Sequence, residues 1–282
     1  MKNRRRLLAL CILLSSATLA QSPVWPEHPA HHELIESSGN RYEIYWAVPS
    51  GAQRKLTTVI YIHGVQGADR PGAKNFVEGG LLDVSAAKGY LSVGMSMPGY
   101  GQSTGKADFC GAGAQTALRS VLRRVRTWAS VDRERIIVSG LSCGAIVAAM
   151  VADKEPLAGV VLISGVYDFG DMYQKWHSPA WPLEPATLQY IEDSAAADGT
   201  AESASARRSA LPNAKQFRSP ALLVAGGKDR IVDQDQSVQM DRALKQNGKR
   251  STLILNPEQG HLISYEDWAS YVDDFARKVF NR

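Results

Sequence analysis

Short apolar runs recur along this chain, and stretches of helical character separate most of them. The runs read TTVIYI, LSVGMSM, RIIVS, GVVLI, ALLVA and TLIL, and they occupy residues 57–62, 91–97, 135–139, 159–163, 221–225 and 252–255. Runs this short that are rich in β-branched residues are typical of strands buried on both faces. Strands that alternate with helices are joined by right-handed crossovers. The pattern therefore predicts an α/β fold with a mostly parallel, twisted sheet and helices on both faces.

Two further strands and five helices complete the predicted pattern. Residues 32–35 and 41–48 flank Ser-Ser-Gly-Asn and predict a hairpin, which brings the sheet to about eight strands. Helices are expected at residues 76–88, 113–129, 143–152, 234–246 and 265–280. The apolar stripe is clearest over residues 113–129, where arginines occupy the outer face.

Residues 166–217 interrupt the alternation of strands and helices. Their first part is aromatic, with Tyr167, Tyr173, Trp176, Trp181 and Tyr190. Their second part, residues 193–210, is rich in Ala, Ser and acids, and it can be helix or mobile loop. We expect residues 166–217 to form a small insertion that caps the site, although packing of the aromatic side chains against the core explains them nearly as well.

The first twenty residues have the three-part layout of a secretory signal peptide. A basic stretch at residues 2–6 precedes an apolar run at 7–14, and Thr18-Leu19-Ala20 supplies small residues at the positions before a cleavage point. The apolar run is short for a membrane span, which needs about 20 residues. An uncleaved anchor is the alternative. We expect a signal peptide at 1–20 and one domain at 21–282, secreted or periplasmic and without stable membrane insertion.

Charge excludes nucleic acid as a partner. The net charge of +4 comes entirely from Lys2, Arg4, Arg5 and Arg6, and beyond them 28 basic residues balance 28 acidic ones. A neutral body offers no electrostatic footprint for a phosphate backbone. The chain also has no Gly-rich phosphate loop, and the histidines at 28, 31 and 32 have no further ligands at metal-binding spacing. We therefore expect no cofactor and no metal, and a small-molecule substrate.

The segment Gly140-Leu141-Ser142-Cys143-Gly144 lies between an apolar strand and an apolar helix. Gly-x-Ser-x-Gly in this context predicts a tight turn that holds a serine nucleophile in strained dihedrals above the sheet. The helix that follows points its N-terminus at the same place, so the N–H of Cys143 can bind a developing oxyanion. We predict Ser142 as the nucleophile rather than Cys143, because the glycine spacing centres on Ser142.

A serine nucleophile needs a base and an acid that orients the base. Asp229 follows the run ALLVA, and His261 follows TLIL, so both lie where ligands bind in open α/β sheets. The chain order Ser142, Asp229, His261 is the order expected for such a sheet. Asp168, which follows GVVLI, is the alternative acid.

The loop after the first apolar run is expected to supply a second oxyanion donor. It reads His63-Gly64-Val65-Gln66-Gly67, and the N–H of Val65 is the candidate, with His63 shaping the loop.

Loss of Cys11 with the signal peptide leaves two cysteines, Cys110 and Cys143. Two thiols in an oxidising compartment can pair, and a small buried residue at Cys143 with a free thiol at Cys110 is the alternative.

These residues resemble the α/β-hydrolase superfamily over nearly the whole mature chain. The similar motifs are HG at 63–64, PGYGQS at 98–103, GLSCG at 140–144, GGKDRIV at 226–232 and QGH at 259–261. The C-terminal third looks most like the catalytic domains of prolyl oligopeptidases and of dienelactone hydrolase relatives. The chain departs from the peptidases at Ala145 and Val65, where they tend to carry glycine.

The resemblance implies an α/β-hydrolase fold and a serine hydrolase that works through an acyl-enzyme. We expect a carboxylic ester as the substrate, with a short peptide or amide as the alternative. A hydrolase-like binding protein without catalysis is the rival from another class, because a fold can be kept after its chemistry is lost.

Overall fold

The computed structural model of the protein describes residues 30–52 and 55–280. The predicted signal peptide at 1–20 and its cleavage point lie outside the described residues. Among the residues that are described, no helix is long and apolar enough to cross a membrane.

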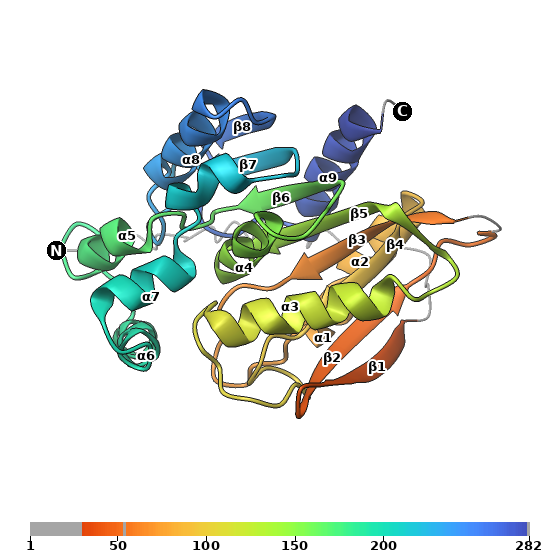
Figure 1. Ribbon diagram of the computed structural model, residues 1–282, viewed down its shortest axis with the longest axis horizontal. Coiled ribbons are helices and arrows are strands. Elements are labelled where there is room, and N and C mark those ends of the chain that lie inside the picture. Colours follow the sequence, from red (N-terminus) through yellow and green to blue (C-terminus); the bar gives the residue numbers. More distant parts are fainter. Residues whose placement is uncertain (1–29, 53–54, 281–282) are drawn as a thin grey trace, which may run out of the picture.

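The described part of the chain forms one eight-stranded sheet in the order β1-β2-β4-β3-β5-β6-β7-β8 (Figure 1). Its strands are β1 (His31–Ser37), β2 (Asn40–Ala47), β3 (Leu56–Ile62), β4 (Leu91–Met95), β5 (Val131–Leu141), β6 (Gly159–Ile163), β7 (Ala221–Gly226) and β8 (Ser251–Asn256). β2 pairs antiparallel with β1 and with β4, whereas the remaining neighbours are parallel. The predicted mostly parallel sheet is therefore confirmed.

Helices cover both faces of this sheet, which separates two hydrophobic cores. The helices are α1 (Lys74–Glu78), α2 (Leu81–Ala87), α3 (Ala112–Val125), α4 (Cys143–Ala152), α5 (Phe169–Trp176), α6 (Pro185–Ala196), α7 (Ala201–Arg208), the 3-10 helix η1 (Leu211–Gln216), α8 (Asp235–Gln246) and α9 (Tyr265–Val279). The larger core includes buried residues of α3, α4 and α8, and the other includes those of α1, α2 and α9. Because both faces are covered, the central strands carry apolar residues at successive positions.

The structure divides the helix expected at residues 76–88 into α1 and α2. Gly80 lies between them with φ +80°, a left-handed conformation that glycine adopts without a steric cost. A Cβ on Gly79 would lie 2.1 Å from Cε2 of Tyr265, the first residue of α9, so a side chain there would have to displace the tyrosine ring. The prediction of one continuous helix was wrong because Gly80 takes a left-handed conformation and Gly79 lies against Tyr265 of α9.

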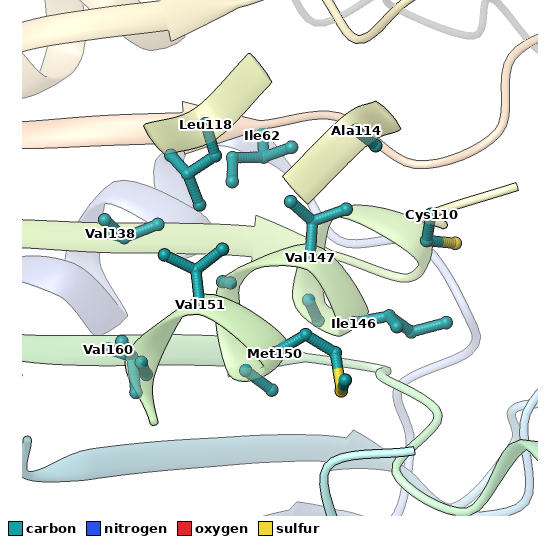
Figure 2. Packing of buried hydrophobic residues seen from close by; sticks show 14 of the residues in the cluster. Ile62, Cys110, Ala114, Leu118, Val138, Ile146, Val147, Met150, Val151 and Val160 are labelled. Carbon is teal, nitrogen blue, oxygen red and sulfur yellow. The ribbon is translucent and has the colours of Figure 1, made fainter. Parts of the chain in front are cut away.

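Helix α4 is the most deeply buried helix, and it carries the turn after β5. All ten of its residues are buried. Figure 2 shows Val147 and Val151 of α4 in the same buried cluster as Leu118 of α3 and Val138 of β5. Full burial of such aliphatic side chains contributes about 1.5–3 kcal/mol each, so the helix and its first turn are held firmly.

The edge strand β8 differs from the prediction of a buried run. Within residues 30–52 and 55–280, β7 is its one partner strand, and none of its residues is buried, with Leu255 45% exposed. A short apolar run has the same sequence appearance at an edge as in the middle of a sheet.

Residues 166–217 form helices α5, α6, α7 and η1, so residues 193–210 are mostly helical rather than a loop. These helices lie beside the end of the sheet toward which the arrows of β3 and β6 point (Figure 1). Trp176 and Ile191 are buried and belong to the larger core. The segment therefore packs on the domain at the carboxyl ends of parallel strands.

Candidate active site

Ser142 occupies a strained turn between β5 and α4. Its φ of 56° and ψ of −119° lie outside the regions that residues with a Cβ prefer. Its N–H donates to the carbonyl of Ile163 at 2.8 Å, and its own carbonyl accepts from the N–H of Ala145 at 2.9 Å. Bonds from the neighbouring strand and from the helix thus hold the serine in this conformation.

The glycines on either side of Ser142 are required by close backbone packing. A Cβ on Gly140 would lie 2.2 Å from the carbonyl carbon and oxygen of Gly144. A Cβ on Gly144 would lie 2.2 Å from the carbonyl oxygen of Ile62, on β3. The Gly-x-Ser-x-Gly spacing is therefore a packing requirement of a strand and a helix that meet at a sharp turn.

Asp229 and His261 are hydrogen-bonded to each other across the loops that follow β7 and β8. Asp229 is buried, and its Oδ1 accepts from the N–H groups of Ile231 at 2.8 Å and Val232 at 2.9 Å. Its Oδ2 lies 2.8 Å from Nδ1 of His261. Because a carboxylate only accepts, Nδ1 carries the proton, and Nε2 of a neutral His261 keeps its lone pair.

Asp168, the alternative acid, has a different partner. It precedes α5 as its N-cap, and its carboxylate accepts from the N–H of Asp171 at 3.1 Å. N-capping explains an aspartate at this position without a role in catalysis.

Two cavities meet at Ser142 and His261. The first, here called the loop cavity, has a volume of about 390 Å³ and is lined by the loop at 63–67, by α1 and by the start of α9. The second, here called the cap chamber, has a volume of about 520 Å³ and lies under residues 176–191. Both are lined by Val65, Ser142, His261 and Leu262. The structure thus brings Ser142, His261 and Val65 together at one junction.

The cap chamber has a mostly apolar wall. Its lining includes the side chains of Phe109, Ile146, Trp176, Leu183, Ile191 and Ile231. Glu184 is the carboxylate among its described lining residues, and it accepts from the N–H of Thr187 as the N-cap of α6. Of the aromatic residues in the first part of residues 166–217, Trp176 lines this wall, whereas Tyr173 lines a separate groove.

His63 has a structural environment. It is buried, its Nδ1 donates to the carbonyl of Gly64 at 2.7 Å, and its Nε2 accepts from the N–H of Met97 at 3.1 Å. Burial lowers the pKa of His63 to about 4, because charge is costly in an apolar surrounding. The hydrogen bonds of His63 tie the loop to Met97. The loop also lies close to the serine, because a Cβ on Gly64 would lie 3.1 Å from Cβ of Ser142.

Cys110 and Cys143, whose pairing was one of the two alternatives left open by the sequence, are bonded as a disulfide, with their Cα atoms 5.5 Å apart.

The buried side chain of Arg208, near this disulfide, was not predicted from the sequence; it is 1% exposed. An arginine in an Ala/Ser-rich stretch has the appearance of a surface residue.

Among the described residues, no group of three or more His, Cys, Asp or Glu is arranged to hold a metal ion.

Comparison with solved structures confirms the α/β-hydrolase fold. The acylaminoacyl peptidase of Pyrococcus horikoshii is 18% identical, covering 90% of this chain and 42% of that chain, with a TM-score of 0.69. An esterase from Pyrococcus furiosus is 17% identical over 89% of this chain and 93% of that chain, with a TM-score of 0.65. An esterase from Rhizomucor miehei is 17% identical over 92% and 86%, with a TM-score of 0.70. The chain spans less than half the length of the peptidase.

The sequence itself matches the model of the prolyl oligopeptidase family over residues 119–282, which is more than half of the chain. The chain therefore belongs to the prolyl oligopeptidase family, and with it to the serine hydrolases. Among curated proteins, none matches the sequence. The matched region contains Ser142, Asp229 and His261.

Proposed function

We propose that this protein is an extracytoplasmic esterase in which Ser142, His261 and Asp229 form a catalytic triad. The observation that carries the proposal is the hydrogen bond between Asp229 and His261 at the junction of two cavities that Ser142 also lines. The three residues come from the loops after three parallel strands, so a rigid sheet sets their spacing.

Acylation begins when Oγ of Ser142 attacks the ester carbonyl and Nε2 of His261 takes its proton. Asp229 keeps the imidazole in the tautomer with Nδ1 protonated and stabilises the imidazolium that forms. His261 then gives the proton to the leaving alcohol, and the acyl group stays on Ser142. A water molecule activated by the same histidine releases the acid.

The tetrahedral intermediate carries a negative oxygen that needs hydrogen-bond donors. The N–H of Cys143 faces it from the first residue of α4, where the helix dipole also favours negative charge. The N–H of Val65 is the second donor, supported by the close approach of the 63–67 loop to Ser142. Removal of one such donor typically costs about 10²–10³ in kcat.

The two cavities receive the two sides of the ester. The mostly apolar cap chamber takes the acyl group, because burial of apolar surface there gives favourable binding. The loop cavity takes the leaving alcohol. Its lining includes Asp69 and Asn75, which suit a polar or hydrated group.

An ester substrate is supported by the two esterases whose folds match this chain over most of both lengths. Hydrolysis of short peptides is the second candidate. It is supported by the family match and by the similarity to the acylaminoacyl peptidase. Amide hydrolysis would use the same groups, since His261 can protonate a leaving amine as well as an alcohol.

An extracytoplasmic location is part of the proposal. It rests on the signal-peptide pattern of residues 1–20 and is supported by the disulfide between Cys110 and Cys143. Structural disulfides persist mainly in oxidising compartments. Fractionation of cells that produce the full chain, with N-terminal sequencing of the product, tests both the compartment and cleavage before Gln21.

The substrate class is tested with the processed protein on matched substrates that differ only in the scissile bond. Initial rates are compared for 4-nitrophenyl butyrate, for butyryl 4-nitroanilide and for aminoacyl and prolyl 4-nitroanilides. We expect turnover of the ester and little or no turnover of the anilides. Efficient cleavage of an anilide would contradict the ester assignment and favour the peptidase candidate.

A further inference from the structure

Cys143, the neighbour of Ser142, is covalently joined to a loop outside its own helix. It is the first residue of α4, and in the proposed function its N–H holds the oxyanion. Its sulfur is bonded to Cys110, which lies 33 residues earlier in the loop before α3. The side chain starts from the Cα next to the donor nitrogen, so whatever fixes Cys110 also restrains the position of that donor.

The loop that carries Cys110 has an unusual backbone that is fixed by polar contacts. Phe109 and Cys110 have φ values of 43° and 59°, which are costly for residues with a Cβ and persist only where the surroundings hold them. The N–H of Phe109 donates to the hydroxyl of Tyr190 on α6 at 2.9 Å. The carboxylate of Asp108 accepts from the N–H of Gly113 at 2.6 Å.

Arg208 ties this loop to the α6–α7 segment. Its buried guanidinium donates from Nε to the carbonyl of Phe109 at 2.8 Å and from Nη2 to that of Asp108 at 2.9 Å. It also donates to the carbonyl of Ser194 on α6 at 3.3 Å and forms an ion pair with Asp198. The side chain of Arg208, on α7, thus links α6 to the carbonyls of Asp108 and Phe109 at the start of the strained turn.

Helix α4 has little need of a tether as a body, because all ten of its residues are buried. Figure 2 shows Cys110 at the N-terminal end of this helix, beyond Ile146 and Val147. The disulfide therefore restrains the first residue of α4, directly after the strained Ser142, where the position of the backbone N–H matters for the proposed chemistry. A path of contacts runs from α6 and α7 through Arg208 and the loop to the proposed oxyanion donor.

We propose that Cys110 is a positioning residue for hydrolysis, because its bond to Cys143 sets the place of the Cys143 N–H relative to the oxyanion. The inference rests on the proposed function. A misplacement of about 1 Å in a catalytic group can cost a hundredfold in rate. Loss of the disulfide therefore lowers kcat and leaves the binding of ground-state substrate nearly unchanged.

The test uses the processed protein with the variants Cys110→Ala and Cys110→Ala/Cys143→Ala, the second of which leaves no unpaired thiol. Val84→Ala is the control, because Val84 is buried in α2 in the core on the other face of the sheet and its truncation lowers stability without touching the turn. For each protein we measure the unfolding midpoint, kcat and KM for 4-nitrophenyl butyrate, and the affinity of an alkyl trifluoromethyl ketone. The ketone forms a tetrahedral adduct with a serine nucleophile and so reports on oxyanion binding.

We expect both cysteine variants to lose about tenfold to a hundredfold in kcat, with KM within about twofold of wild type and the ketone weakened by the same factor as kcat. Val84→Ala loses stability and keeps kcat and the ketone affinity. Wild-type kcat and ketone affinity in folded cysteine variants would overturn the inference alone. If neither cysteine variant folds, the folded wild-type protein is reduced with TCEP instead, and thiol titration checks that the disulfide is open. An unchanged kcat in the reduced protein would then overturn the inference. An inactive wild type would overturn the proposed function as well.

Discussion

The turn around Ser142 and the α5–α7 segment both line the cap chamber, yet they are built in different ways. In the turn, backbone contacts backbone, and a Cβ on Gly140 or Gly144 would lie 2.2 Å from main-chain atoms. In the segment, a few buried side chains hold helices whose other faces are exposed. Two residues are buried in each of α6 and α7, including Ile191 and Arg208.

This difference separates the part that performs the chemistry from the part that selects the substrate. A close-packed turn has one conformation, which suits a nucleophile that must keep a fixed position. A wall built from side chains on helices can change its shape by substitution while the fold persists. We therefore expect changes at the turn and its partners to abolish activity or folding, and changes on α6 to alter which acyl groups are accepted.

Apart from loss of the nucleophile itself, the largest effect is expected from Asp229→Asn. The amide oxygen can keep the bonds from the N–H groups of Ile231 and Val232, which turns the amide nitrogen toward His261 and forces the wrong tautomer on the imidazole. Such a change lowers kcat by roughly 10⁴ with little change in KM. The measurement is kcat and KM for 4-nitrophenyl butyrate, with Asp168→Asn as the matched control. A severe loss in Asp168→Asn and a mild one in Asp229→Asn would reverse the assignment of the acid.

Replacing one glycine in each region with alanine tests the comparison through the unfolding free energy. Gly140→Ala places a methyl group against the backbone of Gly144, so we expect it to lose more than about 3 kcal/mol of unfolding free energy or not to fold. In Gly170→Ala the methyl group, at 3.5 Å from its neighbours, has room within α5, and alanine favours a helix by up to about 1 kcal/mol. Denaturant unfolding of both variants measures the difference. Equal losses at the two positions would show that the turn is not unusually constrained.

His63 and His177, two of the histidines outside the proposed triad, are expected to change stability with pH in opposite directions. His63 has its pKa lowered by burial from 6.5 to about 4, so between these values the unfolded chain binds a proton that the folded chain does not. Its contribution is complete above pH 6.5, and the unfolding free energy falls by up to about 3 kcal/mol as pH drops to 4. His177 on the other region has its pKa raised by hydrogen bonds with the carbonyl of Tyr173 and with Glu192, so its small contribution is lost as pH rises.

Denaturant unfolding between pH 4 and 7 checks this prediction with the variants His63→Asn and His177→Asn. The first is expected to flatten the fall in stability below pH 6.5, and the second to leave it nearly unchanged because His177 is well exposed. If the unfolding free energy of His63→Asn falls below pH 6.5 as steeply as that of the wild type, His63 takes up its proton in the folded state.

The smallest effect is expected from a larger side chain in the wall of the cap chamber. Ile191→Trp fills part of the space proposed for the acyl group, so kcat/KM for a nitrophenyl decanoate is expected to fall about tenfold relative to the acetate. Ala201→Trp adds the same side chain on α7 in a groove away from Ser142, and it is expected to leave the ratio unchanged. If both variants keep the wild-type ratio, the acyl group binds elsewhere.

The sheet and the turn could be predicted from sequence because their determinants are local. A run such as GVVLI defines a strand within five residues, and Gly140 and Gly144 flank the turn that they permit. Asp229 and His261 could be named as partners because each follows a strand directly, and parallel strands end at one edge. Their catalytic roles stay predictions.

Arg208 and the loop at Phe109 could not be predicted, since their contacts join residues about a hundred positions apart. The exposure of β8 depends on its place at the edge of the sheet, which a short apolar run does not reveal. The break at Gly79 and Gly80 depends on how closely α9 packs against α1. In each case tertiary packing, rather than local pattern, decides the outcome.

The central claim is that Ser142 is the nucleophile, and its most direct test is the rate of hydrolysis of 4-nitrophenyl butyrate by Ser142→Ala beside the wild type. A serine removed from a triad costs roughly 10⁶ in kcat, so we expect the variant to fall to the background rate while its unfolding midpoint stays near that of wild type. A folded Ser142→Ala protein that hydrolyses the ester at the wild-type rate would contradict the account.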